Sequence, residues 1–265
     1  MGHRGESMAV VTRVLHVREL RWVEAGFAAF SFSEHATWLA VLVYALAHGG
    51  PRQVGIVAVA QLLPGVLLAP FAAYSGDRFP PQRAIAVGYA LQSVAMAGTA
   101  IAMAAGASLA AYVLGGAAAT CITFTRPVMG SLLPGITHAP SDLVAANVVT
   151  GFIEQVGVFV GPLAAGLLMA LSSPTMVFAA AAGATAFACF AAFMVTSVDA
   201  FTRPAELDAS TVVSQVLEGF ATLRHEGRVR VLVALGASAG LVKGIADVTF
   251  VTFADARLDG GGGQS

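Results

Sequence analysis

The sequence has few charged residues. Only 11% of its 265 residues are Asp, Glu, Lys or Arg, whereas 57% are apolar or aromatic. Soluble domains carry about 25% charged residues on average. A chain with so few charges cannot cover a water-exposed surface, so the composition indicates that a lipid bilayer is its main solvent. The net charge of −1 gives no reason to expect a nucleic-acid partner.

The sequence also has few cysteines and lacks the common motifs of enzymes and metal sites. Cys121 and Cys189 both lie inside apolar runs, which does not indicate a disulfide framework. The six histidines fall in separate segments, without the spacing of metal ligands. The sequence has no phosphate-binding loop, no dinucleotide fingerprint and no nucleophile elbow. We therefore expect no metal site, no cofactor and no enzymatic activity.

Long apolar runs are abundant, and they predict an all-α integral membrane protein with about seven transmembrane helices. A spanning helix needs about 20 mainly apolar residues. The predicted spans are Trp22–Ala47, Val54–Tyr74, Ala84–Ala105, Leu109–Thr125, Leu143–Leu171, Met176–Val198 and Val229–Phe253.

The arginines predict the orientation. With the N-terminus on the cytoplasmic side, only Arg52 and Arg257 lie on the external side, and Lys243 lies within the last span. The cytoplasmic side and the inner helix ends then hold Arg4, Arg13, Arg18, Arg21, Arg78, Arg83, Arg126, Arg203, Arg224, Arg228 and Arg230. Basic residues favour the cytoplasmic side. We therefore expect a multi-pass protein of the cell membrane with a cytoplasmic N-terminus.

The connections predict four regions. These are a cytoplasmic lead-in (residues 1–21), a six-helix transmembrane lobe (22–198), a cytoplasmic amphipathic linker (199–228) and the first helix of a truncated second lobe (229–265). The linker is assigned because its apolar residues recur at helical spacing. Since the chain stops at a glycine run just past a seventh span, we expect a fragment that lacks most of a second lobe and does not transport alone.

Ionisable residues within the spans are the candidate functional groups. An ionisable side chain at the bilayer centre costs about 2.5–3.5 kcal/mol on insertion scales, so it usually faces a cavity or a partner. Glu34 in the first span and Glu154 in the fifth are candidates for proton coupling or for lining the substrate cavity, with a packing role as the alternative. Lys243 and Asp247, four residues apart in the last span, are candidates for the same roles, and the alternative is a charge-neutral pair on one helix face. His35 is interpreted as a polar packing residue, with a proton relay as the alternative. Arg126 is interpreted as a headgroup or topology anchor, with a substrate ligand as the alternative.

The loop after the second span carries a family signature. Ala73-Tyr74-Ser75-Gly76-Asp77-Arg78-Phe79-Pro80-Pro81-Gln82-Arg83 resembles G-x-x-x-D-R-x-G followed by basic residues, a loop signature of the major facilitator superfamily. Asp77, Arg78 and Arg83 match, whereas Ala73 and Pro80 stand in place of the two glycines. The resemblance implies a conformational latch between two lobes; the alternative is that these charges set topology and cap a helix.

The fifth span carries a second signature. Gly157-Val158-Phe159-Val160-Gly161-Pro162-Leu163-Ala164-Ala165-Gly166 is similar to G-x-x-x-G-P-x-x-G-G, which is associated with antiporters of that superfamily. At 100° per residue, one face of this span holds Asn147, Gly151, Glu154, Gly157, Gly161 and Ala165. The alternative is a stripe of small residues that allows close helix packing.

Two further stretches resemble the macrolide and siderophore exporter branch of the superfamily, particularly its actinobacterial members. They are Ser33–Trp38 and the join of the fourth and fifth spans, Thr123–Asn147. The resemblance implies multidrug-type efflux of a small amphipathic molecule, a drug or a siderophore, in exchange for protons. Two alternatives stay open: a facilitator or importer on the same fold, and a membrane-anchored sensor with a missing cytoplasmic domain.

Overall fold

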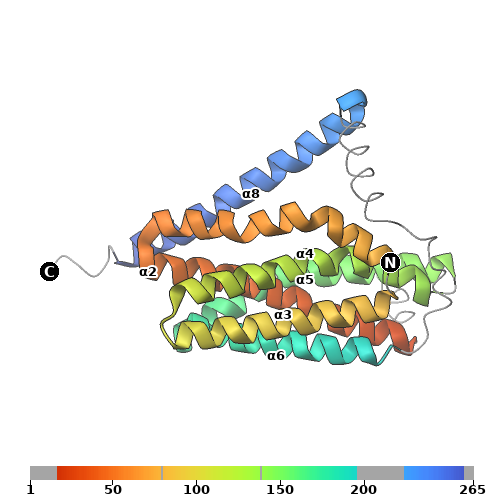
Figure 1. Cartoon of the computed structure of the whole chain (residues 1–265), viewed down its shortest axis with the longest axis horizontal. Coiled ribbons are helices and arrows are strands. Elements are labelled where there is room, and N and C mark those ends of the chain that lie inside the picture. The colour runs from red at the N-terminus through yellow and green to blue at the C-terminus, as the bar shows by residue number, and fades with distance from the viewer. Residues whose placement is uncertain (1–16, 79, 138, 196–223, 260–265) are drawn as a thin grey trace, which may run out of the picture. The chain divides into compact units, whose positions relative to one another are not determined.

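The computed structural model describes residues 17–78, 80–137, 139–195 and 224–259, which form helices and no strands. The helices are α2 (Arg18–Arg78), α3 (Pro81–Ala104), α4 (Ser108–Ile136), α5 (Pro140–Leu171), α6 (Pro174–Phe193) and α8 (Gly227–Asp259). Figure 1 labels them in chain order. The predicted all-α fold is confirmed. The lead-in up to residue 16 and most of the amphipathic linker (196–223) lie outside the described residues.

Five stretches of the described residues are helical, long and apolar enough to cross a bilayer. They are α3, α4, α5, α6 and Gly227–Ala246 of α8. Helix α2, which holds the first two of the seven predicted spans, is not among them.

The chain divides into two compact units, and each is described by itself. One consists of residues 1–41 and 60–204 and contains both outer parts of α2 together with α3 to α6; the other consists of residues 42–59 and 205–265. In the second unit α2 breaks at Gly50, whose φ of 66° and ψ of −168° are not helical. A positive φ favours glycine because it has no Cβ. The expected connection between the first two spans is therefore a single-residue break inside α2.

Helix α4 is longer than the sequence predicts. The predicted span ends at Thr125, before Pro127, but α4 continues through Pro127 and Pro134 to Ile136. Proline is tolerated in transmembrane helices because neighbouring groups satisfy the freed backbone carbonyls. Arg126 consequently lies inside a continuous helix and not at a helix end.

The first unit is a helix bundle. Helix α3 packs against α4 and α6, and α5 contacts α4 and α6; Figure 1 shows α3 and α6 alongside each other. Helix α2 approaches α6 at Gly26, where an added Cβ would lie 3.3 Å from the Cβ of Ala191. The hydroxyl of Ser33 donates to the carbonyl of Ala181 at 3.3 Å. Small residues thus bring the first part of α2 against α6.

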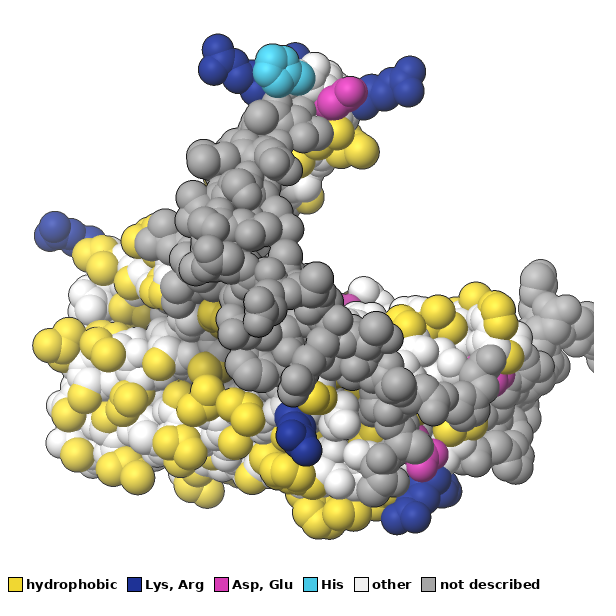
Figure 2. Space-filling view, turned by 45° about the vertical axis from the view of Figure 1, so that its right-hand side comes forward, with side chains coloured by type: hydrophobic (Ala, Val, Ile, Leu, Met, Phe, Trp, Pro, Cys, Tyr) yellow, Lys and Arg dark blue, Asp and Glu magenta, His cyan; other side chains and the backbone are white. Residues whose placement is uncertain are grey.

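The bundle has an apolar core and an apolar outside. Its core includes Leu20, Phe27, Phe30, Ile85, Tyr89 and Leu132. On α5, large apolar side chains remain exposed, namely Val144, Val148, Phe152, Phe159, Leu163, Leu167 and Leu171. Figure 2 shows a face on which hydrophobic side chains are widespread and charged ones are few. A soluble protein rarely exposes such a surface, so these side chains fit a bilayer.

Candidate functional site: an arginine between two glutamates

Arg126 joins two carboxylates from two other helices. Its Nη2 donates to Oε2 of Glu34 on α2 at 2.7 Å, and its Nη1 donates to Oε1 of Glu154 on α5 at 2.8 Å. Both are also ion pairs, and hydrogen bonds between charged groups are the strongest that side chains make. Because Arg126 lies on α4, the cluster ties three helices of the first unit together.

The cluster is only partly buried. The side chains of Glu34, Arg126 and Glu154 keep 22%, 37% and 37% of their full exposure. Two carboxylates and one guanidinium sum to a charge of −1 when all three are ionised. One bound proton, or one cationic group of a ligand, neutralises the cluster. A surface accessible to such a ligand and a charge that changes with protonation are the two properties that ion coupling requires.

Helices α2 and α5 run side by side in a constant register. The hydroxyl of Thr150 donates to Oε1 of Glu24 at 2.7 Å, across a separation of 126 residues. Gly157 faces Ser31 and Gly161 faces His35 at that same separation. A fixed offset over three turns means that the two helices are parallel here.

The offset between α2 and α5 explains why a long side chain is needed to join Glu34 and Glu154. At an offset of 126, the residue opposite Glu154 is Ala28, six positions before Glu34. With a rise of 1.5 Å per residue, Glu34 and Glu154 are displaced by about 9 Å along the helix axes. The long guanidinium side chain of Arg126, entering from α4, reaches both carboxylates.

The glycines of the predicted antiporter signature fall into two groups. Gly157 and Gly161 are buried, and an added Cβ would collide with Ser31 and, at 2.7 Å, with the Cβ of His35. Gly166, which lies off this face, has no such neighbour within 4 Å. Pro162 lies inside α5 without ending it. The predicted shared face therefore meets α2 at Gly157 and Gly161, whereas Asn147 and Gly151 on the same face are exposed.

The interpretation of Arg126 as a headgroup or topology anchor is wrong. That interpretation followed from the predicted end of its span at Thr125, whereas the structure carries α4 on to Ile136 and occupies the guanidinium with two carboxylates. His35 fits the packing role. Its Nδ1 lies 2.8 Å from the carbonyl oxygen of Ser31 in its own helix, and its Cβ lies against Gly161.

Glu24 is a buried acid that the predicted site residues omit. Its side chain is on the first turns of α2, keeps 5% of its exposure and accepts the hydroxyl of Thr150. Its position inside the predicted first span could have marked it, because Leu20, Phe27 and Phe30 place core residues on its side of the helix. An acidic residue close to the start of a span is easily attributed to the membrane surface.

The structure does not describe the side chains of all the predicted site residues. Lys243 and Asp247 belong to α8, but their side chains lie outside the described residues, as do those of Asp77 and Arg78 at the end of α2. Arg83 is exposed in the first turn of α3. The residue at the N-cap of α3 is Pro80, which makes no side-chain cap hydrogen bond. Asp77 is therefore not the N-cap of α3.

The all-α fold and the apolar exterior define a multi-pass membrane protein, and an ionic cluster lies between its helices. The chain belongs to the Major Facilitator Superfamily, whose family model matches residues 25–257. A search of curated proteins found no match. The chain is accordingly a secondary membrane transporter, and membership of this family implies a lipid bilayer and a small-molecule substrate.

Proposed function

We propose that this chain provides the proton-coupling lobe of an exporter for small amphipathic molecules, of the drug or siderophore type. Protons entering from outside exchange for substrate leaving the cell. The observation that carries the proposal is the bridge from Arg126 to Glu34 and Glu154, at 2.7 and 2.8 Å. Ionisable residues at membrane depth are functional by default because their burial is costly.

In this mechanism, protonation and helix packing are linked. When both acids are ionised, Arg126 holds α2 and α5 through one charge-assisted hydrogen bond each. A proton on Glu34 weakens the bond to α2, and a proton on Glu154 weakens the bond to α5. The neutral cluster then moves through the closed states of the cycle at lower electrostatic cost than the charged one.

The substrate competes with the proton for the same carboxylates. Arg126 occupies one oxygen of each glutamate, and the side chains keep partial exposure. An ionised cluster with a net charge of −1 attracts a cationic or hydrogen-bond-donating substrate, and a protonated cluster releases it. Alternation between these two states, with a second lobe rocking against this one, gives exchange transport.

The other signatures receive supporting roles in the proposal. Gly157, Gly161 and Pro162 give α5 the close contact and the bend associated with antiporters of the family. The loop with Asp77, Arg78 and Arg83 is proposed as a conformational latch on the cytoplasmic side. Lys243 and Asp247 are proposed as a charge-neutral pair within α8.

The test is dye uptake driven by a proton gradient into inverted membrane vesicles, with the protein expressed from its complete gene. We expect Glu34→Gln and Glu154→Gln to reduce uptake at least tenfold while membrane insertion stays normal. Asp142→Asn, in the first turn of α5, is the matched control and should retain uptake. Unchanged uptake in both glutamate variants would sink the proposal, and uptake that survives a proton ionophore would identify a facilitator instead.

A further inference from the structure

A second acidic site lies deeper in the bundle than the arginine cluster. Glu24 on α2 keeps 5% of its exposure and Tyr89 on α3 keeps 2%. The neighbours of Glu24 along its helix, Val23 and Phe27, are core residues. An ionised carboxylate in apolar surroundings is costly unless a cation or several donors compensate it.

The compensation at Glu24 is incomplete. Oε1 accepts one hydrogen bond, from the hydroxyl of Thr150 at 2.7 Å, while Oε2 is buried without a hydrogen-bond partner among the described residues. No ion pair to Glu24 forms within those residues. One neutral donor does not offset a buried negative charge, whereas a proton on Oε2 removes that charge.

The surrounding helices supply few other charges. Arg126 on α4 is occupied by Glu34 and Glu154, and the thiol of Cys189 on α6 donates to the carbonyl of Ala86 at 3.4 Å. On α3 a polar group in the core is the hydroxyl of Tyr89, which keeps 2% of its exposure as a residue. It is buried and has no hydrogen-bond partner among the described residues.

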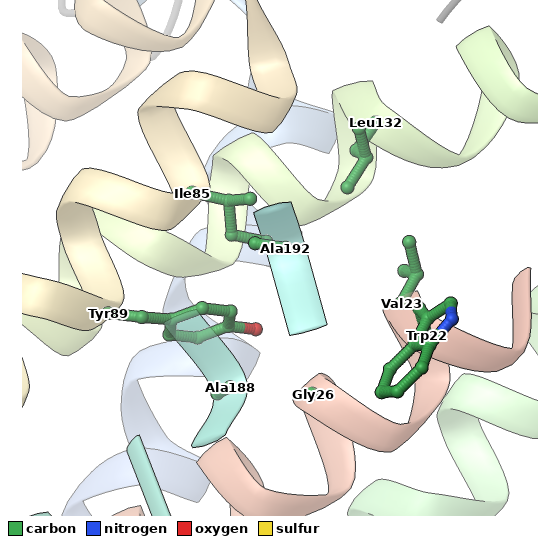
Figure 3. A pocket seen from close by; sticks show the side chains of 8 residues that line it. All are labelled: Trp22, Val23, Gly26, Ile85, Tyr89, Leu132, Ala188 and Ala192. Atoms are coloured by element: carbon green, nitrogen blue, oxygen red, sulfur yellow. The ribbon is translucent and has the colours of Figure 1, made fainter. Parts of the chain in front are cut away.

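Tyr89 points into a small cavity that also touches the first turns of α2. The cavity has a volume of about 10 Å³ and is lined by Trp22, Val23, Gly26, Ile85, Tyr89, Leu132, Ala188 and Ala192. Figure 3 shows the hydroxyl of Tyr89 directed toward the space between Gly26, Val23 and Ala192. Glu24 does not line this cavity, and its Oε2 and the Tyr89 hydroxyl do not bond to each other.

From this geometry we infer that Glu24 and Thr150 form a second proton-binding site, separate from the Glu34–Arg126–Glu154 cluster. The proton binds to Oε2 of Glu24 and converts the carboxylate into a neutral carboxyl group. Thr150 fixes the carbonyl oxygen Oε1. Thr150 and Glu154 are one turn apart on α5, which places the two sites next to each other along that helix. Any use of this proton in transport rests on the proposed function, but its binding does not.

The test is infrared spectroscopy of the purified protein, expressed from its complete gene, in an ester-free detergent near neutral pH. A protonated carboxyl group gives a carbonyl band that shifts in D2O. We expect Glu24→Gln to remove one such band and the matched variant Glu19→Gln, five residues earlier on α2, to keep it. A band pattern unchanged by Glu24→Gln overturns the inference.

A second variant keeps Glu24 in place. Thr150→Val removes the hydroxyl that bonds Oε1 and preserves the side-chain shape. A carbonyl that loses a hydrogen bond vibrates at higher frequency, so the Glu24 band should move upward. An unmoved band overturns the site as described. Since neither measurement involves transport, a failed uptake assay with Glu34→Gln and Glu154→Gln leaves this inference standing, and the reverse also holds.

Discussion

The contact between α2 and α5 predicts that the same substitution has different effects on stability at two glycines of the antiporter signature, Gly161 and Gly166. At Gly161 an added Cβ would lie 2.7 Å from the Cβ of His35 and 3.1 Å from backbone atoms of Phe32 and Ala36. Backbone atoms of a packed helix cannot rotate away, so the two helices must separate. At Gly166 an added Cβ meets no such atom within 4 Å. We therefore expect Gly161→Ala to be destabilising and Gly166→Ala to be tolerated.

The magnitude follows from two opposing effects. Overpacking of a closed contact costs about 1–3 kcal/mol. Replacing glycine by alanine in a helix gains up to about 1 kcal/mol. Because the collision at Gly161 involves backbone atoms, we place its steric cost in the upper half of that range, about 2–3 kcal/mol. The helix gain is common to both variants, so the difference between Gly161→Ala and Gly166→Ala should be about 2–3 kcal/mol in the free energy of unfolding.

The assay is equilibrium unfolding in mixed detergent micelles, followed by far-ultraviolet circular dichroism of the protein expressed from its complete gene. Both variants and the unaltered protein are measured in the same micelle series. Equal stability of the two variants would refute the packing geometry, because only the contact with α2 distinguishes the two positions. A loss at Gly166→Ala alone would contradict it outright.

Three further predictions address the arginine, a turn and the orientation. Arg126→Lys should reduce gradient-driven uptake at least tenfold in vesicles, because one ammonium group cannot donate to two displaced carboxylates in the fork geometry of a guanidinium. Gly106→Ala should destabilise the protein by about 1–2 kcal/mol in the same unfolding assay, because Gly106 has a φ of +71°. The control Gly183→Ala, within α6, should not destabilise the protein. In a cysteine-free background, Arg52→Cys should react with an impermeant maleimide added to intact cells. Arg83→Cys should react only after the cells are permeabilised. The opposite pattern would reverse the proposed orientation.

The fold was predictable from the sequence because the helices carry their own signals. Apolar runs of spanning length, and prolines at the first turns of α3, α5 and α6, place most helices within a few residues. The length of α4 was not predictable from the same rules, since they end a helix before Pro127. In a bilayer the neighbouring helices keep the backbone helical past the proline.

Two of the three residues of the candidate site were predictable from the sequence. Glu34 and Glu154 stand out in the sequence because each interrupts an apolar run. Their partner does not, because Arg126 lies where a span was expected to end and arginines are common at such ends. A contact between residues 92 positions apart depends on how three helices pack, and no local pattern records it.

The register between α2 and α5 limits how the proposed coupling sites can operate. Glu24 and Thr150 form one contact between these helices, and Ser31 with Gly157 and His35 with Gly161 form the next two, all in the same offset. A helix contact closed by glycines transmits a shift of one helix directly to the other, because no flexible side chain lies between them. In the proposed mechanism, protonation that loosens Arg126 from either glutamate therefore acts on two helices that are already held in register. Glu34 and Glu154 are then expected to respond together, and the buried Glu24 lies on the same pair of helices.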